Sequence, residues 1–366
     1  MKAKTKKRIK IFGFLIFFAA LVFSIFILYG NHRISKIPGM SYKDVLNYTT
    51  QGNEYALITV GIIRNGKMEY TVYGNNGTVL PQYEYEYEIG SLTKSFTTSL
   101  ISKAISEAKM DLDAPINNYI LLPQKAYYPT LASLVTHTSG YKAYYFDRQM
   151  VLNFFGRQSN DFYGITIESI INRVGETDLK DKAYPWVYSN FGMAVAGQCV
   201  AEAYEKDYRS LMNEFVQTDL QLKDTRVSDG AGDLTGYWQW KENDAYLPAG
   251  ALISNISDMM QYCKLHMTEE IQYLALTHEK LIDVEGSPAS FEKMGIREDA
   301  MAMGWILDEQ NGVIWHNGGT SKFNSFLAFD KDRQIGVVIL SNLAPNYRIP
   351  ATVMGMKLIK QLQTEP

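Results

Sequence analysis

The segment EIGSLTKSF, residues 88–96, places a serine and a lysine three positions apart. Residues at this spacing lie on the same side of a helix, so Lys94 can approach the hydroxyl of Ser91. Serine becomes a nucleophile when a base takes its proton, and lysine can be that base once burial lowers its pKa from about 10.4. The pair predicts a nucleophile, Ser91, with Lys94 as its activating partner.

A second S-x-x-K match, Ser106–Lys109, shows that this spacing is weak when taken alone. It lies at the far end of the same predicted helix. Ser91 instead follows Gly90, which permits a sharp turn into the helix, and N–H groups at a helix start can stabilise an oxyanion. We therefore favour Ser91, with an ordinary polar pair at a helix start as the alternative.

A phenol and a carboxamide stand two residues apart in the segment YSN, before an apolar helical run. The hydroxyl of Tyr188 can relay the proton of the serine or protonate a leaving group. The amide of Asn190 can hold Lys94 and a substrate carbonyl. The alternative is that Asn190 is the N-cap of the following helix and Tyr188 a packed aromatic residue.

The segment WHNGGTSKF ends a predicted strand with His316, Asn317, Gly318 and Gly319. Two glycines allow close backbone approach, as substrate binding along a strand edge requires. His316 adds a titratable group with an ordinary pKa near 6.5, so kcat/KM is expected to change at about pH 6 to 7 if this side chain contacts substrate. The alternative is a hairpin turn with a satisfied histidine.

The order of the predicted elements indicates the fold class. Two β-rich runs flank Asn65-Gly66, a strong hairpin signal, and a helical pattern covers Ser91 to Met110. Residues from about 111 to 299 are mostly helix and loop. Four strands return between about 300 and 342, and a helix follows from about Pro350 to Leu362. This order predicts an α/β (α+β) fold, in which an antiparallel sheet built from both ends of the chain is flanked by helices and carries an inserted, mostly helical subdomain.

The N-terminus predicts a membrane anchor. Six basic residues lie within positions 1–10 and precede an uncharged apolar run at 11–29. Nineteen helical residues extend about 28 Å, which matches a bilayer core. The positive-inside rule leaves residues 1–10 in the cytoplasm and everything after residue 30 outside. We expect a cytoplasmic segment 1–10, a signal anchor 11–29, a linker 30–40 and a catalytic domain 41–366; a cleaved signal peptide is the alternative.

Composition excludes several function classes. The formal charge of -3 argues against a dedicated nucleic-acid binder. The five histidines show no H-x-x-x-H spacing, and no phosphate-binding or dinucleotide-binding glycine motif occurs, so we expect neither a metal nor an organic cofactor.

The two cysteines, Cys199 and Cys263, lie in apolar helical stretches and are interpreted as buried free thiols, with a disulfide as the alternative.

Taken in order, the motifs Ser91-x-x-Lys94, Tyr188-x-Asn190 and His316-Asn317-Gly318 resemble those of the class C β-lactamase-like serine hydrolases. That family includes penicillin-binding DD-peptidases, D-aminopeptidases and esterases. The segments LASLVTHTSGY (131–141) and LPAGALISNISDMMQY (247–262) resemble two further signatures, interpreted as structural. The resemblance covers about residues 41 to 362. It implies a β-lactamase/transpeptidase-like fold, acylation of Ser91, a proton shuttle at Tyr188, and an oxyanion hole made by the N–H groups of Ser91 and Gly319.

One departure bears on the substrate, because H-N-G stands where β-lactamases carry K-T-G. A histidine is mostly neutral at pH 7, so it attracts the carboxylate of a penicillin or of a D-Ala-D-Ala terminus less strongly than lysine does. Together with the predicted anchor, the resemblance then implies a membrane-anchored, extracytoplasmic serine hydrolase of D-alanyl amides or esters of the cell envelope, of the DD-carboxypeptidase, D-aminopeptidase or D-alanyl esterase type. Peptidoglycan stem peptides and D-alanylated teichoic acids are candidate substrates. A class C-like β-lactamase and a non-catalytic penicillin-binding or wall-sensing domain are the alternatives.

Overall fold

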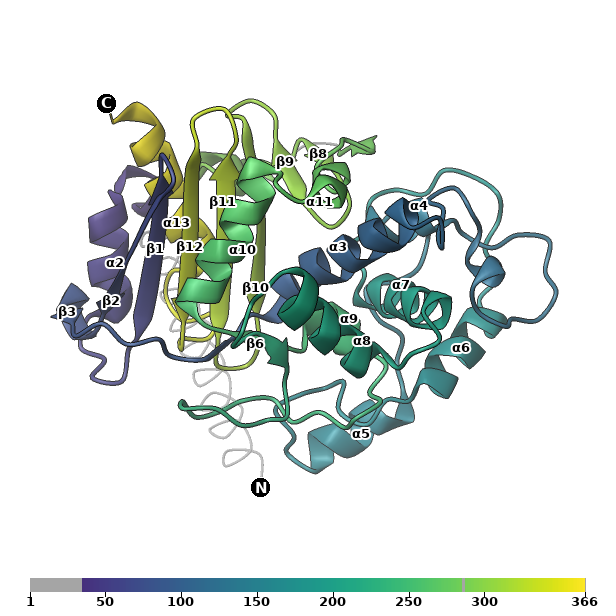
Figure 1. Ribbon diagram of the computed structural model, residues 1–366. Coiled ribbons are helices and arrows are strands. Elements are labelled where there is room, and N and C mark those ends of the chain that lie inside the picture. Colours follow the sequence, from purple (N-terminus) through teal and green to yellow (C-terminus); the bar gives the residue numbers. More distant parts are fainter. Residues whose placement is uncertain (1–34, 285–286, 366) are drawn as a thin grey trace, which may run out of the picture.

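The structure is a computed structural model that describes residues 35–284 and 287–365 (Figure 1). The predicted cytoplasmic segment and the predicted span at 11–29 lie outside the described residues. Within the described ranges, no helix is long and apolar enough to cross a membrane.

An antiparallel sheet joins the two ends of the described chain. Its nine strands, counted over the described residues, follow the order β3-β2-β1-β12-β11-β10-β9-β8-β7. They are β1 (Ile58–Arg64), β2 (Lys67–Tyr73), β3 (Val79–Leu80), β7 (Ile282–Asp283), β8 (Ala300–Met301), β9 (Ile306–Asp308), β10 (Val313–Gly319), β11 (Asn324–Asp330) and β12 (Ile335–Ser341). Because β1 pairs with β12, the predicted sheet built from both ends is confirmed.

Helices cover both faces of this sheet and form a second lobe beside it (Figure 1). One face carries α2 (Tyr42–Thr50) and α13 (Ala351–Thr364), and the other carries α10 (Ile256–Thr268). The remaining helices are α3 (Thr93–Ser106), α4 (Leu131–Val135), α5 (Arg148–Phe155), α6 (Ile167–Glu176), α7 (Asn190–Ala203), α8 (Tyr208–Glu214), α9 (Leu247–Gly250), α11 (Gln272–Leu276) and α12 (Ala289–Lys293). A small sheet of β4 (Tyr87–Glu88), β6 (Leu252–Ser254) and β5 (Arg226–Val227) links the lobes.

Strand β12 shows why the late strands are apolar without interruption. Successive side chains of a strand point to opposite faces. Ile335, Val337 and Ile339 pack with α2 and α13 in one core cluster. Val338 and Leu340 belong to the other cluster, which includes α10 and the helical lobe. Both faces are therefore covered, and both need apolar residues.

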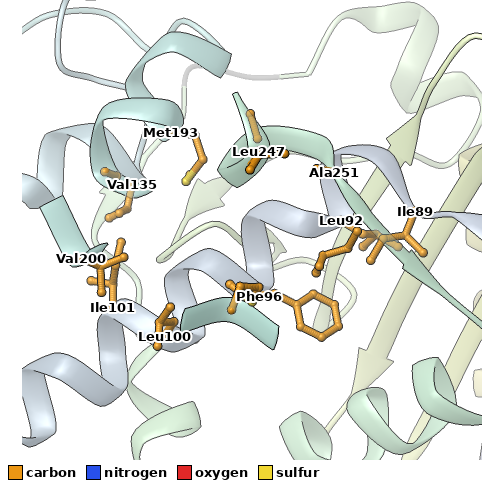
Figure 2. Packing of buried hydrophobic residues seen from close by; sticks show 14 of the residues in the cluster. Ile89, Leu92, Phe96, Leu100, Ile101, Val135, Met193, Val200, Leu247 and Ala251 are labelled. Atoms are coloured by element: carbon orange, nitrogen blue, oxygen red, sulfur yellow. The ribbon is translucent and has the colours of Figure 1, made fainter. Parts of the chain in front are cut away.

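Helix α3 is the central element of the helical lobe, and every residue from Thr93 to Ser102 is buried. Figure 2 shows Phe96 and Leu100 of this helix within a cluster to which Val135 of α4 and Val200 of α7 also contribute. A polar side chain at the start of this helix is consequently surrounded by protein rather than by water.

Candidate active site

Ser91 and Lys94 lie together at the beginning of α3, as predicted. Ser91 is in a 3-10 turn, Gly90–Leu92, that leads directly into α3, so the predicted helix begins with this tighter turn and ends at Ser106. The Nζ atom of Lys94 is 2.9 Å from the Oγ atom of Ser91. Ser106 is exposed and donates to a carbonyl of its own helix.

The surroundings of Lys94 make it a base. Its side chain is fully buried, and its second hydrogen-bond acceptor is the carbonyl oxygen of Ala249, at 2.7 Å. Among the described residues it has no carboxylate partner. Burial lowers the pKa of Lys94 well below its usual value, because the charged form loses its hydration. The neutral amine then has a lone pair that can accept the proton of the serine.

The backbone around Ala249 is held against α3 by side chains of that helix. The hydroxyl of Thr97 donates to the carbonyl of Pro248 at 2.8 Å, and the hydroxyl of Thr93 accepts from the N–H of Leu252 at 3.1 Å. These bonds place the Ala249 carbonyl over the lysine. Sequence reasoning missed this contact, since a backbone carbonyl has no side-chain signature and the segment was interpreted as structural.

Tyr188 contacts both Ser91 and Lys94. Its ring centroid lies 4.8 Å from the Nζ atom of Lys94, and its hydroxyl hydrogen-bonds Ser91. Burial raises the pKa of Tyr188 above its ordinary value, and the hydrogen bond to Ser91 opposes this only in part. Tyr188 therefore keeps its proton, so its hydroxyl can donate to a leaving group while the lysine is the base.

His137 is a residue of this site that sequence reasoning did not select. Its buried ring lies 4.7 Å from the ring of Tyr188, and its Nδ1 atom accepts from the N–H of Ser189 at 3.3 Å. Burial is the main cause that lowers the pKa of His137, and a proton on Lys94 lowers it further. The histidine is therefore neutral and fixes the backbone beside Tyr188. The sequence feature that could have pointed to it is the segment HTSG (137–140), which lies within the signature 131–141 that was interpreted as structural.

Asn190 is close in sequence to Tyr188 but does not hold the lysine directly. It is the first residue of α7 and is partly exposed. Within the described part of the chain, Lys94 hydrogen-bonds Ser91 and Ala249 instead. The alternative of Asn190 as the N-cap is wrong, because Ser189 is the N-cap and its Oγ atom accepts from the N–H of Gly192 at 2.8 Å.

Strand β10 brings its glycines against the nucleophile turn, the 3-10 turn Gly90–Leu92 that carries Ser91. A Cβ atom on Gly318 would lie 1.9 Å from the carbonyl oxygen of Ile89 and 2.9 Å from the backbone nitrogen of Ser91. A Cβ atom on Gly90, which has φ +49°, would lie 2.4 Å from the backbone nitrogen of Gly319. The N–H groups of Ser91 and Gly319 are thus brought together, as the predicted oxyanion hole requires.

The edge of β10 is open beside these glycines. Strand β9 pairs with β10 only as far as Trp315. In the described residues, positions 316–319 therefore have a neighbouring strand on one side alone, where β11 lies. A substrate can lie along this edge, as predicted from the two glycines.

His316 differs from the sequence-based expectation. It is 1% exposed and is absent from the cavity lining, because strand alternation directs Trp315 and Asn317 to the cavity instead. Its Nδ1 atom donates to the carbonyl of Asn317 at 2.6 Å, and its Nε2 atom has no partner among the described residues. Burial, together with Lys94, lowers the pKa of His316 to about 3. The expected titration near pH 6 to 7 is therefore wrong, since both causes disfavour the imidazolium ion.

A cavity of about 630 Å³ opens at Ser91. Tyr188, Asn317, Gly318 and Gly319 contribute to its lining, whereas Lys94 lies behind the serine. The rest of the lining consists of Ile37, Trp186, Phe291, Met294, Ile296, Glu298, Ile306, Trp315, Asn324, Pro345, Pro350, Thr352 and Val353. A mostly apolar cavity with a few polar groups near a nucleophile is the usual form of a small-molecule site.

The predicted free thiols are also found. Cys199 and Cys263 are both buried and unpaired with one another. Burial raises the pKa of both thiols, so they are unreactive packing residues and take no part in the site.

Comparison with known proteins identifies the family and the fold. A family model described as Beta-lactamase matches residues 35–352. Protein flp of Staphylococcus aureus strain MW2 is 20% identical over 358 residues, covering 91% of this chain and 67% of that protein. A β-lactamase of Pseudomonas fluorescens is 24% identical over 339 residues, covering 80% of this chain and 90% of that protein. The structure of a β-lactamase/D-alanine carboxypeptidase from Yersinia pestis, complexed with citrate, has a TM-score of 0.66 at 14% identity, covering 87% of this chain and 94% of that chain.

Proposed function

Because the chain belongs to the β-lactamase family of serine hydrolases, we propose that it is a membrane-anchored, extracytoplasmic hydrolase of D-alanyl amides or esters of the cell envelope. The reaction passes through an acyl-Ser91 intermediate. The observation that carries the proposal is the buried amine of Lys94, 2.9 Å from the Oγ atom of Ser91 and without a carboxylate partner in the described residues.

Lys94 and Tyr188 carry out the proton transfers of this reaction. The Oγ atom of Ser91 attacks the substrate carbonyl while the amine of Lys94 takes its proton. The N–H groups of Ser91 and Gly319 stabilise the oxyanion. The hydroxyl of Tyr188 then gives its proton to the leaving alcohol or amine and regains one from the ammonium of Lys94. Water releases the acyl group by the reverse transfers, which restores the free serine.

Several observations favour a D-alanyl compound over a β-lactam. His316 stays neutral at physiological pH, so it adds no positive charge for the carboxylate of a penicillin. The open edge of β10 suits an extended aminoacyl or peptidyl group. One similar structure is named a β-lactamase/D-alanine carboxypeptidase, so a D-alanyl substrate is compatible with this fold.

The predicted anchor would hold the site near the membrane. Ile37 lines the cavity, and eight residue steps separate it from Tyr29 at the end of the apolar run. An extended chain spans at most about 3.6 Å per residue, so these steps cover at most about 29 Å. A substrate close to the outer surface of the cytoplasmic membrane is therefore within reach. Removal of the domain by protease added to wall-stripped cells would support this placement, and protection would contradict it.

The test is intact-mass analysis of the full chain in detergent after incubation with a fluorescent penicillin, followed by an assay with D-alanine methyl ester. We expect a slowly hydrolysed adduct on Ser91 and hydrolysis of the ester. Ser91→Ala should abolish both. The matched control is Ser106→Ala, which alters the other S-x-x-K serine and should change neither.

The alternatives give different results. Rapid turnover of penicillins or cephalosporins without hydrolysis of the ester would support a class C-like β-lactamase. The absence of both adduct and hydrolysis would support a non-catalytic wall-sensing domain and overturn the proposal.

A further inference from the structure

We propose that Glu298 makes this site selective for a substrate that carries a free ammonium group, such as a D-alanyl ester with an unblocked amine. Glu298 would be the specificity-determining residue that binds this ammonium. The inference rests on the proposed function of Ser91 and defines the class of substrate that reaches it.

The position of Glu298 supports this assignment. It lines the same cavity as Ser91 and is the single ionisable residue with a formal charge at neutral pH in the described lining. The carboxyl group has no hydrogen-bond or ion-pair partner among the described residues. The segment is nevertheless fixed, because the N–H of Glu298 donates to the hydroxyl of Ser287 at 2.6 Å.

The charged residues next to Glu298 form no ion pair with its carboxylate. Arg297, the adjacent residue, forms ion pairs with Asp299 at 2.7 Å and with Glu292 at 3.4 Å. No lysine or arginine belongs to the described lining of the cavity. Partial burial raises the pKa of Glu298, since its charge has lost hydration without gaining a partner. A cation that enters the cavity would restore the missing interaction.

The walls of the cavity suit a small cationic group. Trp186 and Trp315 belong to the lining, and aromatic faces attract cations. An aminoacyl ester with a free amine supplies the ammonium group that such a lining favours.

The same charge disfavours a carboxylate. The free carboxylate of a D-Ala-D-Ala terminus or of a penicillin would enter a cavity whose charged residue is also negative. His316 cannot offset this, because it remains neutral. Among the candidate substrates, D-alanyl esters with a free amine are therefore favoured over carboxylate-terminated stem peptides.

The catalytic test compares D-alanine methyl ester with N-acetyl-D-alanine methyl ester on the full chain in detergent. Glu298→Gln should raise KM for the free amine about tenfold, change kcat little and leave the N-acetyl ester unaffected. Tenfold corresponds to about 1.4 kcal/mol, near the lower end for a hydrogen bond to a charged group. The matched control is Glu292→Gln, which removes an exposed charge in the same segment and should not alter the preference.

A binding measurement separates this inference from the proposed hydrolysis. In the Ser91→Ala full chain, calorimetry should show that D-alanine methylamide binds about tenfold tighter with Glu298 than with Gln at that position. N-acetyl-D-alanine methylamide should bind both equally. Selective binding without hydrolysis by the wild-type chain would sustain the inference and reject the proposed function. Equal binding of both amides, or an equal effect of Glu298→Gln on both esters, would overturn the inference even where hydrolysis occurs.

Discussion

Gly318→Ala tests the contact on which the oxyanion hole depends. The new Cβ atom would lie 1.9 Å from the carbonyl oxygen of Ile89, whereas real Cβ contacts are essentially never below 3.0 Å. The difference, 3.0 − 1.9, requires β10 and the nucleophile turn to separate by about 1.1 Å. The new atom would also lie 2.6 Å from the Oγ atom of Ser325, which donates to Ile89 at 2.7 Å. The substitution therefore also disturbs the hydrogen bond that joins Ser325 of β11 to the carbonyl of Ile89.

This separation moves the N–H of Gly319 away from the N–H of Ser91. Loss of one oxyanion donor costs about 3 kcal/mol of transition-state stabilisation, or about 100-fold in rate. A displacement of about 1 Å has a similar effect on a positioned reaction. We expect Gly318→Ala to slow acylation of Ser91 about 100-fold.

The assay is the second-order rate constant for labelling of Ser91 by a fluorophosphonate probe, which does not require the natural substrate. The matched control is Gly39→Ala, because a Cβ atom there would meet no atom within 4 Å. Thermal unfolding of each variant shows whether it is folded. If folded Gly318→Ala reacted within threefold of the wild-type rate, the proposed alignment of β10 with Ser91 would be refuted.

Three further predictions concern charge and protonation. Lys94→Ala should abolish labelling of Ser91 by the same probe, whereas Lys109→Ala, which alters an exposed lysine, should leave it near the wild-type rate; the reverse result would identify the wrong S-x-x-K pair. Because the pKa of His316 is lowered to about 3, the labelling rate should show no His316 titration between pH 5 and 8, and an inflection near pH 6.5 that His316→Ala removes would contradict this. Burial raises the pKa of Glu88 to about 7 from 4.5, so the folded state binds its proton more tightly than the unfolded state. Its contribution to stability is complete below pH 4.5 and is lost as the pH rises to 7, which lowers the free energy of unfolding by about 3 kcal/mol; urea unfolding of Glu88→Gln should lack this decrease, and an identical decrease in the variant would exclude Glu88 as its source.

The amino-acid sequence alone determined the local geometry of this protein. The spacing of Ser91 and Lys94 predicted their contact, because three residues along a helix return the chain to the same side. The pair Asn65-Gly66 predicted a tight hairpin, and both residues have positive φ in the turn between β1 and β2. These features depend on neighbours in the chain, so their pattern can be recognised without the fold.

Tertiary structure decided the electrostatics of the site. The carbonyl that binds Lys94 comes from Ala249, 155 positions away, and carries no side-chain signal. His316 was expected to titrate near neutral pH, and only its burial beside Lys94 lowers its pKa. Glu298 belongs to no recognisable sequence motif. It becomes a candidate specificity-determining residue only because it lines the cavity at Ser91. Desolvation depends on which distant segments exclude water from a group, and residue spacing does not encode that.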